Sequence, residues 1–287
     1  MLITNRDRLP ILSVQGQIRH PYTGNPYYIR ENGSAVTLPA MGGITYNARL
    51  TDSVFAYEAD HLEPGVTIKN YNDDNDGLQL LSCIGNEATV ISGDAKGAKG
   101  FVTGTHGGCE HTLLYFPRAD LEKMAVYDRI QIKACGQGLQ IEGHPEMLLR
   151  SIDPNLFDKL GLRWGSDGML EVPVAARVPA YLMGSGIGDA SAARGDYDIM
   201  TTDMDAIHSL GLDRLRFGDL VLLEDCDNSF GRAYRKGAVT IGVVIHGNCV
   251  RMGHGPGVTT FLTCKTGGIR GVLDDGANIG FYMGIEK

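Results

Sequence analysis

The sequence lacks the features that mark membrane proteins, secreted proteins and most nucleic-acid-binding proteins. No segment approaches the ~20 consecutive apolar residues of a membrane span, and the N-terminal residues hold no apolar stretch long enough for a signal peptide. Lysine and arginine form no basic run, and the formal net charge of −8 disfavours contact with a phosphate backbone. We therefore expect a cytoplasmic protein with no membrane and no nucleic-acid partner, and we rank an OB-like single-strand binder last among the alternatives.

Several metal and nucleotide motifs are also missing. None of the six cysteines forms a CxxC pair, so we expect free thiols and neither a zinc ribbon nor a redox motif. The HExxH motif is absent, and the glycine-rich segment 93–100 is no phosphate loop because Ala98 replaces its second glycine. Asp189 stands where a dinucleotide-binding GxGxxG would need glycine. Hydrolytic chemistry would then depend on water activated by a metal or by a carboxylate.

Glycine is abundant, at 39 of 287 residues, against the ~7% of an average protein. This excess indicates many tight turns, and helix signals are few, as in the segment 151–160 with Asp153 as cap and Pro154 at the first helical position. We predict a mainly β (β-rich α+β) fold of two barrel- or sandwich-like domains with a few short helices. The N-terminal β domain with an extended arm takes residues 1–150. The C-terminal β domain, residues 151–287, carries an aspartate-rich loop and a GHGPG turn.

Two segments hold closely spaced acidic residues. The segment 183–203 is rich in glycine and contains Asp189, Asp196 and Asp198, with Arg194 as its only cation. Carboxylates this close repel one another unless a cation lies among them, so this loop is a candidate for binding a metal or a polar ligand. The second segment, 72–76, reads as a solvated turn before a strand at 78–84, with metal or substrate binding as the alternative.

Histidines stand at the ends of predicted strands. Segments 97–109 and 237–249 align without gaps and share five of thirteen residues, including His106 and His246. Either the match is chance in a glycine-rich chain, or both histidines face one cleft between the domains, where small-ligand sites are common. His254 lies in the turn 253–257, where the backbone N–H groups at Gly255 and Gly257 could face an anion. A rigid hairpin connection is the other explanation for that turn.

Four motifs are spread along the chain: GAKGFVTGTHGG at 97–108, MGSGIG at 183–188, GDYDIMT at 195–201 and GHGPGVTT at 253–260. They resemble those of an uncharacterised prokaryotic family, the domain-of-unknown-function family four-four-three-eight. The resemblance runs through most of the chain. It implies a two-domain, mainly β protein and no established activity.

The segment 188–198, GDASAARGDYD, is similar to the Gly-Asp-x-His-Ala-Ala-Gln-Gly-Asp-Gly-Glu motif of the formamidase/acetamidase family. Asp189 and Asp196 match its aspartates, whereas Ser191 replaces the histidine, Arg194 the glutamine and Asp198 the glutamate. The resemblance implies hydrolysis of a small amide. Loss of the motif histidine removes a metal ligand, so nitrogen ligands would have to come from elsewhere in the chain, and Arg194 favours an anionic substrate.

These observations lead to a working assignment. We expect a hydrolase of a small amide or other C–N bond, acting in an inter-domain cleft with a divalent metal, zinc or calcium. The alternative is a non-catalytic binding protein for a small anionic metabolite, and a homo-oligomer is expected in either case. The expected catalytic residues are Asp189, Asp196, His254 and His106; the substrate-binding residues are Arg194, Ser191, Gly255 and Gly257; and the metal ligands are Asp189, Asp198, His106 and His246.

Overall fold

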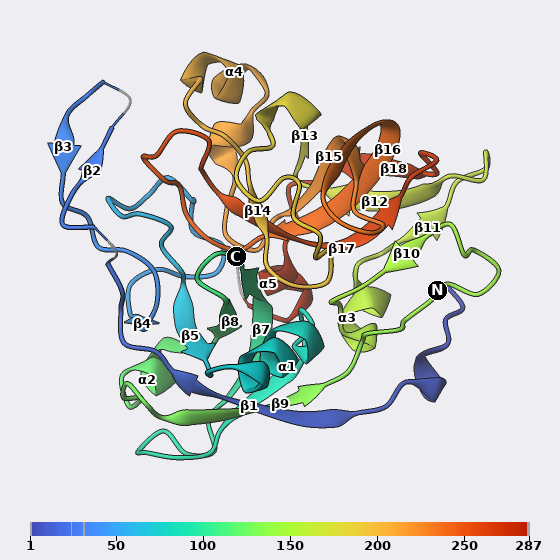
Figure 1. Cartoon of the computed structure of the whole chain (residues 1–287). Helices are drawn as coiled ribbons and strands as arrows, with labels where there is room; N and C mark the ends of the chain where they lie inside the picture. The colour runs from blue at the N-terminus through green and yellow to red at the C-terminus, as the bar shows by residue number, and fades with distance from the viewer. Residues whose placement is uncertain (1, 24, 31, 286–287) are drawn as a thin grey trace.

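The N-terminal half of the chain forms a closed β-barrel (Figure 1). A computed structural model describes residues 2–23, 25–30 and 32–285. The sheet order is β1-β9-β6-β7-β8-β5-β4, and pairing between β1 and β5 closes six of these strands into the barrel. The strands are β1 (Leu12–Ile18), β4 (Ile44–Thr45), β5 (Gly65–Lys69), β6 (Glu87–Val90), β7 (Lys99–His106), β8 (His111–Tyr115) and β9 (Arg129–Ala134).

The C-terminal half forms a second, six-stranded sheet, which lies above the barrel in Figure 1. Its order is β10-β17-β16-β15-β13, and β14 pairs with β17 outside this path. The strands are β10 (Leu148–Leu149), β13 (Ala176–Val178), β14 (Tyr197–Asp198), β15 (Leu220–Asp227), β16 (Ala233–Val244) and β17 (Gly257–Cys264). A three-stranded sheet joins β11 (Arg163–Trp164), β12 (Leu170–Val174) and β18 (Ile269–Leu273).

Helices are few and short, which confirms the predicted mainly β fold. They are α1 (Asp73–Leu81), α2 (Arg118–Leu121), α3 (Pro154–Lys159), α4 (Met204–Ser209) and α5 (Ile279–Tyr282), with 3-10 turns η1 (Arg6–Arg8), η2 (Ala180–Leu182) and η3 (Leu212–Arg214). Helix α3 begins as predicted, because Asp153 accepts hydrogen bonds from two backbone N–H groups of its first turn. None of the described helices is long and apolar enough to cross a membrane.

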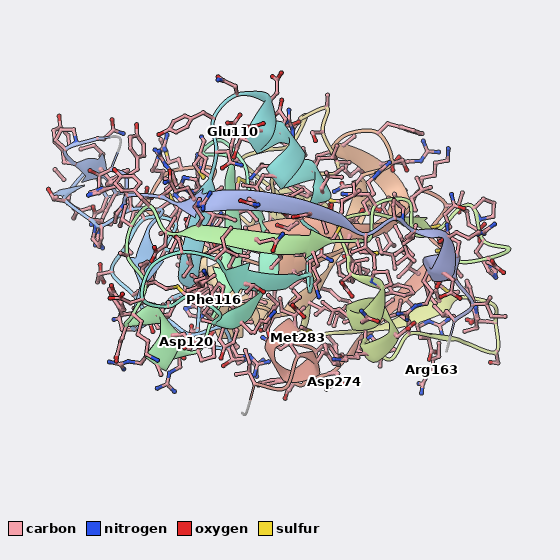
Figure 2. All side chains as sticks on the ribbon, turned by 90° about the horizontal axis from the view of Figure 1, so that it is seen from below. Glu110, Phe116, Asp120, Arg163, Asp274 and Met283 are labelled. Atoms are coloured by element: carbon pink, nitrogen blue, oxygen red, sulfur yellow. The ribbon has the colours of Figure 1, made fainter. Side chains whose placement is uncertain are left out.

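The strand predicted at 78–84 is wrong, because residues 78–81 belong to helix α1, which ends at Leu81. The acidic residues of 73–76 occupy the first turn of α1, where negative charge is favourable. The side chain of Asn75 accepts a hydrogen bond from the backbone of Asn70 and donates one to the carbonyl of Glu110. Figure 2, seen from below, places Glu110 beside α1, with β1 crossing the barrel next to it.

One hydrophobic core joins the two halves of the molecule. Phe101 and Leu113 of the barrel belong to the same buried cluster as Phe261 of the second sheet. The halves are also linked by Thr259, whose hydroxyl accepts from the backbone N–H of Thr105 at 3.1 Å and donates to its carbonyl at 2.9 Å. The end of β7 therefore lies against β17 and its neighbour β16. The predicted domain boundary near residue 150 stays a prediction.

The N-terminal arm carries a small hairpin, β2 (Tyr28–Ile29) and β3 (Ala35–Val36), that projects from the body in Figure 1. The aromatic side chains of this arm point in different directions. Tyr22 and Tyr27 are more than half exposed, at 53% and 56%, whereas Tyr28 is buried. Only Tyr28 among these three therefore packs into the molecule, and it does so next to Asp60.

Candidate metal centre

Three buried histidines from separate parts of the chain meet between the barrel and the second sheet. His106 ends β7, His246 follows β16, and His61 lies in the irregular segment before β5. The ring centroids of His106 and His246 are 4.1 Å apart, and those of His61 and His246 are 5.0 Å apart. One ligand atom from each of the three rings lies within 4.8 Å of the other two. This spacing suits coordination of one ion.

Two of these rings are oriented by buried carboxylates. Nδ1 of His106 lies 2.5 Å from Oε1 of Glu63, and Nδ1 of His61 lies 3.1 Å from Oδ1 of Asp60. Metal-binding histidines commonly direct one ring nitrogen at a carboxylate, which fixes the ring and leaves the other nitrogen for the metal. Nε2 of His106 is therefore the nitrogen left for a shared ligand, whereas Nε2 of His61 already lies 3.1 Å from Nδ1 of His254 and 3.5 Å from Oδ2 of Asp198, so a metal there would replace these contacts.

The third ring, His246, is oriented by the backbone. Its Nδ1 lies 2.9 Å from the carbonyl of Gly247, and the backbone nitrogen of Gly257 makes a weaker contact with it at 3.3 Å. Its Nε2 lies 2.9 Å from Oδ2 of Asp196 and 3.5 Å from Oδ1 of Asp198. All three rings thus direct Nδ1 away from the point where the rings meet. The carboxylates of Asp196 and Asp198 lie next to Nε2 of His246, and we call this side of the centre its inner face.

The inner face holds buried polar atoms without hydrogen-bond partners. Among the described residues, these atoms include Oδ2 of Asp196, Oδ2 of Asp198 and Nε2 of His246. Buried polar atoms are nearly always hydrogen-bonded, and leaving one without a partner typically destabilises the folded protein by ~1–3 kcal/mol. Each of these atoms has an ionisable neighbour at 2.9 Å, in His246, Asp196 or His254, but no hydrogen bond of good geometry. A cation satisfies nitrogen lone pairs and carboxylate oxygens at the same time.

The charges of the cluster support the same conclusion. Burial alone would lower the pKa of His246, but Asp196 and Asp198 outweigh it and raise this pKa to about 9. Burial likewise opposes ionisation of Asp196, yet the charges of His106 and His246 hold its pKa below the usual value. Burial, followed by the charge of His246, lowers the pKa of His106. Without a cation, protons on the imidazoles balance the carboxylates, and a metal can take the place of these protons.

Glu63 is a fixed support for this centre. Its carboxylate is fully buried and accepts hydrogen bonds from the hydroxyl of Thr67 at 2.5 Å and the backbone of Gly42 at 2.8 Å. Nδ1 of His111 lies 3.0 Å from Oε1, the oxygen that also contacts His106. Burial opposes the charge of Glu63, but His111 and His106 outweigh it and hold its pKa well below the usual range.

His254 lies at the open side of the centre. Its Nδ1 is 2.9 Å from Oδ2 of Asp198 and 3.1 Å from Nε2 of His61. Its side chain is 23% exposed, whereas that of Asp198 is 6% exposed. His254 is therefore placed to exchange protons between solvent and the buried groups.

Glycines explain how the aspartates reach the centre. Asp196 and Asp198 are two residues apart at β14, so their side chains share one face of the strand. The backbone N–H of Gly107 donates to Oδ1 of Asp196 at 2.6 Å. A Cβ on Gly257 would lie 2.0 Å from both Oδ2 of Asp196 and Nε2 of His246. Only glycine at this position leaves that space open.

Other residues expected at the site lie elsewhere. Asp189 is 53% exposed, and its Oδ1 accepts a hydrogen bond from the backbone of Ser191 at the surface. Arg194 forms an ion pair with an acidic residue of α1. Gly255 packs its Cα against the carbonyl of Ile199, where a side chain would collide. The structure thus brings His106, His246, His254, Asp196, Asp198 and Gly257 together and leaves Asp189, Ser191 and Arg194 outside.

Three residues of the centre escaped the sequence analysis, namely Asp60, His61 and Glu63. The sequence signal is a histidine between two acidic residues within four positions, 60–63. His61 also has an unusual positive φ of 54°, which its backbone shows and its sequence does not. The segment 60–63 shows no strand periodicity, so its sequence did not indicate that these side chains face the interior of the protein.

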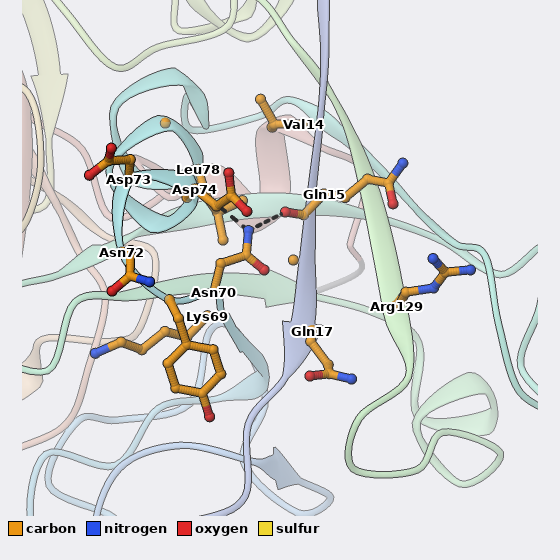
Figure 3. A pocket seen from close by; sticks show the side chains of 13 residues that line it. Val14, Gln15, Gln17, Lys69, Asn70, Asn72, Asp73, Asp74, Leu78 and Arg129 are labelled. Carbon is orange, nitrogen blue, oxygen red and sulfur yellow. Dashed lines mark hydrogen bonds between the residues drawn. The ribbon is translucent and has the colours of Figure 1, made fainter.

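A separate polar hollow lies between β1 and α1 (Figure 3). It has a volume of about 690 Å³ and is lined by residues such as Gln15, Asn70, Asn72 and Arg129. Nδ2 of Asn70 donates to the carbonyl of Gln15 across it at 2.6 Å. The acidic segment 72–76 borders this hollow, and no residue of the metal cluster lines it.

Comparison with known proteins places the chain in a family. Residues 27–158 match the model described as domain of unknown function (DUF4438), N-terminal, and residues 159–283 match its C-terminal counterpart. The chain belongs to the DUF4438 family. The DUF4438 resemblance noted from four motifs is thereby confirmed.

A solved relative shares the whole architecture. The crystal structure of TM1086 is 46% identical, covers 98% of this chain and 99% of its own, and superposes with a TM-score of 0.93. No curated protein matches the chain. A relationship of this DUF4438 protein to the formamidase/acetamidase family is not shown.

Proposed function

We propose that this protein is a metal-dependent hydrolase whose centre is built from His61, His106 and His246 with Asp196 and Asp198. The observation that carries the proposal is the convergence of three buried imidazoles on two buried carboxylates, with His246 common to both groups. Imidazole nitrogen with one or two carboxylates suits zinc and related transition metals, whereas calcium takes oxygen ligands. Of the two metals expected from the sequence, zinc therefore fits this donor set.

The arrangement supports hydrolysis for a chemical reason. A zinc ion polarises a carbonyl group and lowers the pKa of a bound water to about 7. In amide hydrolysis, the water oxygen bonds to the carbonyl carbon, the C–N bond breaks, and the leaving nitrogen takes a proton. His254 is partly exposed and contacts Asp198, so it is placed to carry that proton. The motif at 188–198 is what favours an amide as the substrate.

Metal analysis followed by an activity screen tests the proposal. The protein purified with zinc should hold about one equivalent and should release ammonia from at least one of a panel of small amides. His246→Ala should lose both metal and activity, because it removes a central ligand. His208→Ala is the matched control, since this histidine is exposed and pairs with Asp213 far from the centre. Protein that holds no metal under any condition, or turnover that survives in His246→Ala, contradicts the proposal.

A second candidate function is non-catalytic, metal-dependent binding of a small anionic metabolite. The burial of the ligand atoms favours it, because only His254 among the inner groups is substantially open to solvent. The two functions differ in one measurement. Ligands that stabilise the zinc-loaded protein in a thermal-shift screen but are recovered unchanged after long incubation support binding alone.

A further inference from the structure

A small pocket opens beside the metal centre, and it is lined by two arginines. Its volume is about 270 Å³, and its lining includes Arg30, Thr201, Thr202, Asn248, Cys249 and Arg251. We propose, building on the proposed function, that this pocket holds a carboxylate of the substrate and that Arg251 and Arg30 bind it. The substrate class is then a small amide that carries a carboxylate group.

The pocket shares a wall with the centre. Cys249 lines the pocket, and its Sγ lies 2.8 Å from Oδ1 of Asp60, the carboxylate that faces His61. One ligand atom each of Cys249, His61 and His254 lies within 4.8 Å of the others. The backbone N–H of His61 also donates to the carbonyl of Asn248. Cys249 is therefore the wall between the pocket and the side of the centre that holds Asp60 and His61.

The charge of the pocket is positive in an otherwise acidic protein. Arg251 is exposed, and it forms no salt bridge with a carboxylate in the part of the chain that the structure describes. Arg30 pairs at 2.9 Å with Glu58, which is 83% exposed, and its Nε is buried without a hydrogen-bond partner. Two guanidinium groups with unused donors, in a chain of net charge −8, are an uncommon local feature. Guanidinium donors match the geometry of a carboxylate.

A neutral donor adds to the arginines. The hydroxyl of Thr201 donates to Oδ1 of Asn248 at 2.6 Å, which fixes the orientation of that amide. Nδ2 of Asn248 then has no acceptor within the described residues and is available to a ligand. This amide donor and the two arginines favour an anion over a neutral polar molecule.

The size of the pocket limits the ligand. Typical sites for drug-sized ligands measure ~300–1,000 Å³, and this pocket falls just below that range. It suits a molecule with few non-hydrogen atoms. Large acylated substrates and peptides are excluded unless they extend beyond the pocket into solvent.

An isosteric pair of probes tests the inference. Butyrate and 1-nitropropane have nearly the same shape, but only butyrate is charged. We expect butyrate to raise the melting temperature of the zinc-loaded protein and to bind at least tenfold more tightly than 1-nitropropane. In Arg251→Gln, butyrate binding should weaken about ten- to a hundredfold, the usual loss for a charge-assisted hydrogen bond. Arg235→Gln, which alters an exposed arginine bonded to the carbonyl of Lys265, is the control.

The outcomes separate this inference from the proposed function. Equal binding of the two probes, or unchanged butyrate binding in Arg251→Gln, overturns the carboxylate pocket. Metal content is measured for every variant, and Arg251→Gln should hold as much zinc as the unmodified protein. Butyrate binding that depends on Arg251 in a protein that takes up no metal would preserve the pocket and overturn the hydrolase. Arg30→Gln repeats the test from the other side if Arg251→Gln does not fold.

Discussion

Gly257→Ala is the sharpest perturbation of the metal centre, because it adds one methyl group at the point where the ligands meet. The new Cβ would lie 2.0 Å from Oδ2 of Asp196 and 2.0 Å from Nε2 of His246. Gly257 has no positive φ, so the backbone itself accepts alanine. The effect of the substitution therefore reports on the space between the two ligands.

The expected size of the effect follows from these distances. Ordinary contact with a Cβ begins at 3.4 Å, so each ligand atom must retreat by about 1.4 Å. Metal–ligand distances vary by only about 0.2 Å, and the site should therefore lose its ion. Overpacking a buried site costs about 1–3 kcal/mol. For a protein of 287 residues, that corresponds to a fall in melting temperature of about 2–5 °C.

The assay combines metal content with thermal unfolding. Gly257→Ala should stay folded by circular dichroism, bind less than about a tenth of the zinc bound by the unmodified protein, and melt at a lower temperature. Gly77→Ala is the matched control, because a Cβ on Gly77 in α1 would meet nothing within 4 Å. That substitution should leave zinc binding unchanged and alter stability by no more than ~1 kcal/mol. Full zinc occupancy in Gly257→Ala would refute the placement of the ion between Asp196 and His246.

Three further predictions concern the same centre. Glu63→Gln removes the carboxylate that orients His106 and should weaken zinc affinity about 10–100-fold, measured by competition with a coloured chelator. The control His144→Ala, at the surface, should leave zinc affinity unchanged. The difference in melting temperature between zinc-loaded and chelator-treated protein should widen from pH 6 to pH 9. The pKa of His246 is about 9 in the folded protein and ~6.5 in the unfolded chain, so protonation of His246 stabilises the metal-free protein fully below pH ~6.5. That stabilisation is lost as the pH rises through 9, whereas zinc binds the deprotonated ring and gains as the pH rises. A difference in melting temperature that shrinks over this range would contradict the assignment. Asp189→Asn should leave zinc content unchanged, because this side chain is half exposed and outside the cluster, and a loss of zinc in this variant would return Asp189 to the ligand set.

Regular elements were predictable because their signals are local. Strand β9 is an example, since buried residues alternate along 129–134 in the pattern of a half-buried strand. The start of α3 followed from Asp153 and Pro154. Helix α1 was missed because its acidic first turn resembles a solvated loop, and its hydrogen bonds involve Asn70 and Glu110, which lie outside the helix.

Two histidines of the centre were predictable, because two similar segments of the chain lie close together in the fold. The matching segments at 97–109 and 237–249 pointed to His106 and His246, whose rings lie 4.1 Å apart. Asp189 was expected with Asp196 from their shared segment, but Gly195 lies between them with a positive φ of 70° and turns the chain just before Asp196. His61 could not be predicted, because its position depends on tertiary packing of an irregular segment.

Crystallography with zinc tests the central claim most directly. Crystals grown from the zinc-loaded protein should give one strong anomalous peak at the zinc edge, about 2 Å from Nε2 of His61, His106 and His246. A carboxylate oxygen of Asp196 or Asp198 should complete the coordination. An anomalous map with no peak among these three rings, or with its only peak at the surface near Asp189, would contradict the account.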